Sequence, residues 1–282
     1  MTQRGVPGGA KMPDSKFGAD GKFERAALQA GVDPEAGSGT SIFDPVLCEL
    51  AYRWFCPADG VILDPFAGGS VRGIVAAKLG RRYIGIDLRA EQIAANLEQA
   101  RLLLSPSEQL RVEWIAGDSR SVELSMKRGC DFVFSCPPYG DLEVYSEDPL
   151  DISTLEFEGF AEAYREIVAR ACALLKPDRF ACFVVGDYRD ERGLYRNFPG
   201  LTIEAFQQAG LALYNEAILV TAAGSLPIRA GKMFESARKL GKTHQNLLVF
   251  VKGDWKKAVE AIGPVEFGEP PSAEPLPGVV PL

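Results

Sequence analysis

Three acidic residues, Asp64, Asp87 and Asp118, each directly follow a short apolar run that is typical of a buried strand. The carboxyl ends of parallel strands share one edge of a sheet, where open α/β sheets bind their ligands. We therefore expect the three carboxylates to face one ligand. Asp87 is placed to accept hydrogen bonds from two ribose hydroxyls, and Asp118 from an exocyclic amine such as that of adenine.

The first of these acids opens a glycine-rich turn, residues 64–70 (DPFAGGS), which leads into a helix predicted over 71–79. Glycines there allow the backbone to approach a ligand closely. The turn has neither GxGxxG spacing nor a GK(S/T) ending, so it cradles a pyrophosphate poorly. Asp64 at its lip disfavours phosphate and favours a cation. A nucleoside ligand that carries a sulfonium and an amine suits this set of groups.

A second group of residues that could take part in chemistry follows the predicted strand at 132–134: Ser135, Cys136, Pro137, Pro138 and Tyr139. Consecutive prolines fix the backbone, so the carbonyl before them points in one direction. That carbonyl can accept a hydrogen bond from a base amino group, while Tyr139 offers a face for stacking. Ser135, one position before Cys136, is expected to point to the other face of the strand.

The chain is acidic, with a formal net charge of −7 over 282 residues, but one segment is basic. Between 229 and 242 the cations outnumber the single acid Glu235, and we predict that this segment binds nucleic acid. Its cations are Arg229, Lys232, Arg238, Lys239 and Lys242.

The remaining composition excludes several classes of protein. No apolar run approaches the roughly 18 residues of a membrane span, and the N-terminus lacks a signal-peptide core, so we expect a cytoplasmic protein without a membrane partner. The six cysteines form no CxxC pair and His244 is the only histidine, which argues against a metal site.

Strands alternate with helices along the chain, which predicts an α/β fold with a doubly wound, mostly parallel sheet. The last two strands, at 219–220 and 247–251, are expected to form an antiparallel hairpin at one edge. We expect a mobile N-terminal arm (1–40), one domain (41–253) and a Pro-rich tail (254–282).

Residues 41–253 resemble the S-adenosylmethionine-dependent DNA amino-methyltransferases (N6-adenine or N4-cytosine type), most of all the small enzymes of phages and prophages. DPFAGGS is similar to their cofactor motif DPFxGSG, and SCPPY to their catalytic motif (D/N/S)PP(Y/F). The resemblance implies a class I (Rossmann-like) methyltransferase fold, S-adenosyl-L-methionine as cofactor and DNA as partner. It also implies a monomer or homodimer in a bacterial or phage-infected cytoplasm. The implied catalytic residues are those of 135–139. The implied cofactor contacts are Phe43, Asp64, Phe66, Ala67, Gly68, Gly69, Asp87, Leu88, Asp118 and Ser119.

Two positions depart from these motifs. Ser70 replaces the last glycine of the cofactor motif. Cys136 replaces the Asp, Asn or Ser of the catalytic motif, and a thiol is a weak hydrogen-bond acceptor. Cys136 keeps two alternatives open: a cytosine-C5 methyltransferase with Cys136 as nucleophile, and an inactive homologue that binds nucleic acid. A third alternative is an RNA guanine-N2 methyltransferase, because those enzymes have similar DPF and PPY motifs.

Overall fold

The computed structural model describes residues 43–124, 126, 128–140, 145–220 and 226–265, with side chains from residue 230 onward in the last range. The predictions for the N-terminal arm and for residues 266–282 of the tail lie outside these residues. Within the described part, no helix has the length and apolar character needed to cross a membrane.

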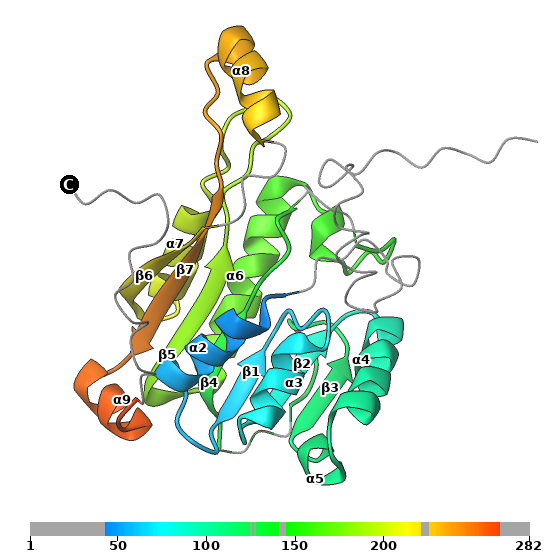
Figure 1. Cartoon of the computed structure of the whole chain (residues 1–282), viewed down its shortest axis with the longest axis vertical. Helices are drawn as coiled ribbons and strands as arrows, with labels where there is room; N and C mark the ends of the chain where they lie inside the picture. Colours follow the sequence, from blue (N-terminus) through cyan, green and yellow to red (C-terminus); the bar gives the residue numbers. More distant parts are fainter. Residues whose placement is uncertain (1–42, 125, 127, 141–144, 221–225, 266–282) are drawn as a thin grey trace, which may run out of the picture. The chain divides into compact units, whose positions relative to one another are not determined.

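A seven-stranded sheet, in the order β3-β2-β1-β4-β5-β7-β6, organises the domain (Figure 1). Five strands run parallel: β1 (Val61–Asp64), β2 (Arg82–Asp87), β3 (Val112–Ala116), β4 (Cys130–Ser135) and β5 (Leu175–Val185). β7 (His244–Lys252) is antiparallel to both β5 and β6 (Ala212–Val220). The predicted doubly wound fold with an antiparallel edge pair is therefore confirmed.

Helices cover both faces of the sheet. The helices of the described residues are α2 (Pro45–Phe55), α3 (Val71–Lys78), α4 (Ala90–Leu103), α5 (Pro106–Gln109), α6 (Phe157–Leu174), α7 (Phe198–Gln208), α8 (Leu226–Ala237) and α9 (Trp255–Ile262), with a 3₁₀ turn η2 (Ile152–Thr154). Of these, α8 projects past the strands (Figure 1). Successive residues of a strand point to opposite faces, so Phe132 and Phe134 join the core beneath α2 and α3, whereas Val133 joins the core beneath α6 and α7.

Several elements differ from the sequence predictions. Helix α8 occupies most of the segment predicted as a basic loop, and α9 lies within the predicted tail, where its Ala258 is fully buried. β5 begins at Leu175, earlier than the expected strand at 180–185, because residues 176–179 bulge out of the pairing with β4. A bulge is one of the few places where a strand tolerates a proline such as Pro177.

Candidate active site

The glycine-rich turn is anchored from below by a buried ion pair. Asp64 ends β1 with no exposed surface, and its Oδ2 lies 2.6 Å from Nε of Arg72, the second residue of α3. The same carboxylate accepts a hydrogen bond from the hydroxyl of Tyr83 on β2 (2.8 Å). Nη2 of Arg72 donates to the carbonyls of Phe66 (2.6 Å) and Ala67 (2.9 Å). One guanidinium thus holds both the acid and the backbone of the turn.

These contacts occupy the Asp64 side chain, whose predicted contact with the cofactor stays a prediction. The cation that it faces is Arg72 rather than a ligand, and its oxygens accept four hydrogen bonds, from Arg72, Tyr83, Ser135 and the Phe66 amide. A buried carboxylate surrounded in this way has no capacity left for a ligand amine. The side chain therefore positions the turn.

Above this anchor the turn is open. An added Cβ at Gly68 or Gly69 would meet no atom within 4 Å, and Gly68 has a φ of +48°, in the left-handed region that glycine adopts readily. Asn96 on α4 donates to the Gly68 carbonyl (2.7 Å), and the Gly68 amide donates to Asp87 Oδ2 (3.0 Å). The turn is therefore a fixed backbone surface with free space over its glycines.

Asp87, at the end of β2, borders the same turn. Its Oδ1 accepts the amide of Arg89 (2.9 Å), and its side chain is 15% exposed. Burial raises the pKa of this carboxyl, although the Arg89 amide and guanidinium and the Gly68 amide oppose the rise. A partly dehydrated acid with one accessible edge is suited to accept hydrogen bonds from ligand hydroxyls. Leu88, the next residue, is half-buried.

Asp118, after β3, is paired with a neighbour. Its two oxygens lie 3.0 and 2.9 Å from Nε of Arg120, and Oδ2 lies 2.9 Å from Nη2. Arg120 also donates to the carbonyl of Leu150 (3.4 Å), in the segment after the catalytic motif. Ser119 donates to the carbonyl of Pro65 (2.6 Å), which ties the end of β3 to the turn. A ligand amine at Asp118 would have to share the carboxylate with Arg120.

Phe43 forms a wall beside the turn. Its ring lies 4.8 Å below the guanidinium carbon of Arg72 and contacts Phe134 edge-on, with centroids 5.8 Å apart. Asp44, the next residue, caps α2 through hydrogen bonds from the amides of Val46 and Leu47, which fixes the entry of the chain. The predicted cofactor residue Phe43 is thus held against the turn by the same arginine.

The catalytic motif begins where β4 ends. Ser135 has no exposed surface and its hydroxyl donates to Asp64 Oδ1. This hydrogen bond links the catalytic motif to the turn, and a catalytic role of the Ser135 side chain stays a prediction. Cys136 and Pro138 are half-buried, and Pro137 is buried.

Tyr139 is held in place by one hydrogen bond and two ring contacts. Its hydroxyl accepts a hydrogen bond from Nε2 of Gln245 on β7 (2.6 Å), and its ring meets Tyr188 and Phe198 edge-on at 6.3 and 5.8 Å. Burial raises the pKa of the Tyr139 hydroxyl, and Cys136 raises it further. The phenol therefore stays neutral and can both accept and donate hydrogen bonds.

The predicted nucleic-acid-binding residues lie on and after α8. Lys232 and Arg238 are exposed, and the Arg238 guanidinium lies 5.1 Å from the ring of Phe234. Lys239 and Lys242 are half-buried, and burial lowers the pKa of Lys242. The side chain of Arg229 lies outside the described ones.

Sequence reasoning missed Arg72, Arg120, Asn96 and Gln245. Arg72 and Arg120 follow the acids that they bind by 8 and 2 residues, and a cation so close to each predicted ligand-binding acid was the available signal. Asn96 and Gln245 gave none, because their partners lie 28 and 106 residues away in sequence. In the described part of the chain, no cluster of His, Cys, Asp and Glu is placed to hold a metal ion.

The chain is similar to known methyltransferases. Residues 47–98 match the sequence model of a family described as DNA methylase, of the N6/N4 type. The type II methyltransferase M.SmaI of Serratia marcescens is 31% identical over 93 residues, which are 33% of this chain and 31% of that protein. The match therefore spans about a third of the length of this relative. The predicted resemblance to DNA amino-methyltransferases is confirmed for the segment with the turn and Asp87.

Solved methyltransferase structures are also similar to this chain. The CcbJ methyltransferase of Streptomyces caelestis is 14% identical, with a TM-score of 0.49, over 77% of this chain and 98% of that one. A TehB-like S-adenosylmethionine-dependent methyltransferase of Corynebacterium glutamicum is 18% identical, with a TM-score of 0.45, over 81% of this chain and 97% of that one.

Proposed function

We propose that this protein is an S-adenosyl-L-methionine-dependent methyltransferase that acts on an exocyclic amino group of a DNA base. One observation carries the proposal: the buried Asp64 carboxylate binds both the glycine-rich turn, through Arg72, and the catalytic motif, through Ser135. The glycine-rich turn (64–70) and the catalytic motif (135–139) are thereby held next to each other. Such an arrangement brings a nucleoside cofactor and a target base together at one sheet edge.

The residues around the turn fit this cofactor. The open backbone at Gly68 and Gly69 leaves room for a ligand, and Asp87 has an exposed edge for the ribose hydroxyls. The Phe43 ring lies beside the turn and contacts Arg72, which binds the backbone of the turn. Asp118 is the acceptor for the adenine amine, with Arg120 as its present partner. The turn has neither the GxGxxG spacing nor the GK(S/T) ending of a pyrophosphate-binding loop.

Bound S-adenosylmethionine supplies an electrophilic methyl group on a sulfonium. The protein's part is to hold the base amino nitrogen in line with that group. Pro137 and Pro138 have no amide hydrogens and fixed φ angles, so the carbonyls beside them are oriented acceptors for the amino group. Tyr139, with its hydroxyl held by Gln245, offers a fixed surface for the base.

The transfer itself needs no covalent enzyme intermediate. Bound cofactor would supply the methyl group directly to the lone pair of the amino nitrogen, and the proton that the nitrogen gives up would pass to water. The nitrogen becomes a better nucleophile as its hydrogens are bound by acceptors such as the motif's carbonyls. This chemistry requires an oriented acceptor and a fixed base rather than a thiolate at Cys136.

The proposal is tested by methyl transfer from labelled cofactor to DNA and to RNA, followed by mass spectrometry of the nucleosides. We expect N6-methyladenine or N4-methylcytosine from DNA, and a loss of product with Asp87→Ala or Tyr139→Ala. 5-Methylcytosine, methylated RNA alone, or no product with a correctly folded protein would each replace the proposal by one of its alternatives. The nucleoside found identifies which one.

A further inference from the structure

The segment that follows β5 folds back on itself as a tight hairpin, residues 187–197. The amide of Arg196 donates to the carbonyl of Tyr188 (2.9 Å), and the amide of Asp190 donates to the carbonyl of Leu194 (2.8 Å). Gly193 has a φ of +83°, a conformation that closes the turn and strains any other residue. Asp190 Oδ1 also accepts the Leu194 amide (2.8 Å). The tip is therefore a defined structure.

The residues at the base of this hairpin pack around Tyr139. Tyr188 is only 6% exposed and meets the Tyr139 ring edge-on, as does Phe198 just after the hairpin. Gly140 packs so closely that an added Cβ would overlap the Tyr188 hydroxyl. Asp187 Oδ1 accepts the amides of both Tyr188 (3.0 Å) and Phe198 (3.2 Å). The hairpin is thus rigidly joined to the candidate base site.

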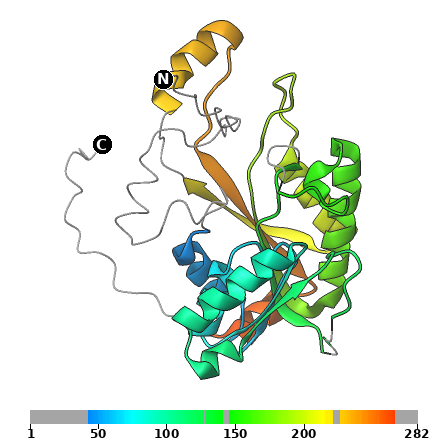
Figure 2. The same ribbon diagram turned by 90° about the vertical axis from the view of Figure 1, so that its right-hand side faces the viewer.

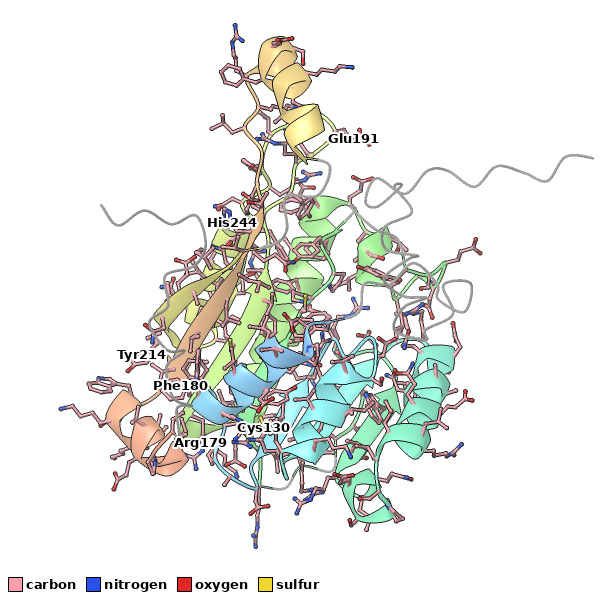
Figure 3. All side chains as sticks on the ribbon, in the orientation of Figure 1. Cys130, Arg179, Phe180, Glu191, Tyr214 and His244 are labelled. Atoms are coloured by element: carbon pink, nitrogen blue, oxygen red, sulfur yellow. The ribbon has the colours of Figure 1, made fainter. Side chains whose placement is uncertain are left out.

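The tip of the hairpin presents apolar surface between cations. Leu194 is 58% exposed and Tyr195 is 45% exposed. The guanidinium carbon of Arg189 lies 3.8 Å from the centre of the Tyr195 ring, and the Arg192 side chain is 79% exposed. Figure 3 labels Glu191, in the same turn, beyond the strand ends.

The hairpin also meets the basic segment that follows α8. The Lys239 ammonium lies so close to Gly193 that an added Cβ there would overlap it. The charge of Asp187 acts on Lys242, whose pKa burial lowers and Asp187 raises. In Figure 2 the hairpin and α8 both project past the strands in the same direction. Cations from two parts of the chain therefore flank one exposed leucine.

We propose that this hairpin is a contact for duplex DNA and that Leu194 enters the base stack as a wedge, which helps to extrude the target base toward Tyr139. The inference rests on the proposed function. A base inside a duplex is out of reach of an enzyme until it is unstacked, and apolar side chains inserted between base steps promote this. Arg192 and Lys239 would contact the flanking phosphates.

A wedge has a property that an ordinary contact lacks: it matters for stacked duplexes and not for single strands. We would measure labelled methyl transfer to sheared genomic DNA, native and heat-denatured, with four proteins: the wild type, Leu194→Ala, Leu194→Met and Leu110→Ala. Leu110, which is 85% exposed between α5 and β3, is the matched control. We expect Leu194→Ala to be about tenfold slower on native DNA and within about twofold of the wild type on denatured DNA. Leu194→Met and Leu110→Ala should resemble the wild type. An equal loss on both forms, or no loss on native DNA, would overturn the wedge.

A second measurement does not depend on catalysis. Permanganate oxidises unstacked thymines, so native DNA with the wild type and S-adenosylhomocysteine should gain reactivity, and Leu194→Ala should abolish the gain. If the wild type methylates native DNA alone, the rates on native and denatured DNA cannot be compared, and the permanganate measurement then tests the wedge. If it methylates neither form, the proposed function fails, but reactivity that depends on Leu194 would still support the wedge. Reactivity that is absent, or unchanged by Leu194→Ala, would refute it.

Discussion

The hydroxyl of Ser135 donates a hydrogen bond to the carboxylate of Asp64, across 71 positions of sequence and between two neighbouring strands. The bond lies in the buried interior, beneath the glycine-rich turn and the catalytic motif. Arg72 neutralises the acid and binds the backbone of the glycine-rich turn. The relative position of the cofactor turn and the catalytic motif therefore depends on one buried charge and its partners.

The first prediction concerns this ion pair. Arg72→Met leaves the Asp64 charge buried without its partner, so the free energy of unfolding should fall by about 3–5 kcal/mol in urea denaturation. The double variant Arg72→Met/Asp64→Asn removes the unpaired charge and should recover part of this loss. A single variant as stable as the wild type would mean that the turn does not depend on Arg72. Arg53→Met, which loses only an exposed pair with Glu49, is the control and should change stability by less than about 1 kcal/mol.

The second prediction concerns the cofactor. Asp87→Ala should weaken binding of S-adenosylmethionine at least about tenfold in calorimetry, because a charge-assisted acceptor to a buried ligand is worth roughly 1.5–3 kcal/mol. Since burial raises the pKa of Asp87, the carboxylate is protonated at a higher pH than an ordinary one. Wild-type affinity should therefore decline as the pH falls toward that raised pKa.

Asp87→Asn serves as the matched variant for this effect. It keeps an acceptor oxygen but has no proton to gain, so its weaker affinity should not change over the same pH range. The exposed Glu91→Gln, in the first turn of α4, should behave as the wild type. Identical pH profiles for the wild type and Asp87→Asn would assign the dependence to another group.

The third prediction concerns stability against pH. Asp131 on β4 accepts hydrogen bonds from Nζ of Lys176 (2.7 Å), Nε of Arg179 (3.3 Å) and the amide of Val61 (3.0 Å). Burial opposes its charge, but these partners outweigh it and lower the pKa of Asp131 below the ordinary 3.8. The lowered pKa contributes stability above about pH 4, and this contribution is lost as the pH falls through the folded-state pKa.

Asp131→Asn should therefore cost about 1–3 kcal/mol at pH 7, and its difference from the wild type should shrink below about pH 4. Urea denaturation across this range measures both. Glu113→Gln, at an exposed position of β3, should cause no such difference. If the loss of unfolding free energy in Asp131→Asn stayed constant down to pH 3, its cause would be altered packing and not the charge of Asp131.

The sequence predicted the parallel part of the sheet because β1, β2, β4 and the end of β5 are buried apolar runs, which are easily recognised in parallel strands. Asp87 was predicted to bind the ribose hydroxyls of a ligand from its position after β2, and the structure places it beside the glycine-rich turn, where it accepts a hydrogen bond from the Gly68 amide. The burial of Asp64 against Arg72 could not be predicted, because a strand-terminal acid looks the same in sequence whether it faces solvent or a buried arginine. Helix α2 was missed although Asp44 and Pro45 form a typical helix start. Gln245 could not be found, since only the antiparallel return of β7 brings it to Tyr139.

The fourth prediction concerns the basic segment. Lys232 and Arg238 are exposed, so each is free to neutralise a phosphate. Lys232→Gln/Arg238→Gln should flatten the slope of log affinity for DNA against log salt by about 1.8, at roughly 0.9 per phosphate contact. Lys242→Gln should have a smaller effect, because that side chain is half-buried and interacts with Asp187. A slope that the double variant leaves unchanged would assign α8 to a surface without DNA contacts.

The last prediction separates direct amino methylation from covalent catalysis by Cys136. A nucleophilic cysteine must become a thiolate, which requires a nearby cation with donors to spare. Arg72 is close enough to interact electrostatically with Cys136, but its Nε and Nη2 are bound to Asp64 and to the turn. Cys136 also interacts electrostatically with Tyr139 and Tyr164, two phenols whose pKa values are raised by burial, so that both stay neutral. These surroundings favour a residue that shapes the pocket.

Cys136→Ser and Cys136→Asn should therefore retain methyl transfer within about tenfold of the wild type, as they preserve size and add a better acceptor. A covalent mechanism would instead make both variants inactive, because a hydroxyl or an amide cannot replace a thiolate. Duplex DNA with 5-fluorocytosine distinguishes the two mechanisms in the wild type, since the fluorine prevents release of an enzyme bound at C6. We expect no complex that survives denaturing electrophoresis. A stable band that disappears with Cys136→Ser would establish carbon methylation and refute the amino-group mechanism.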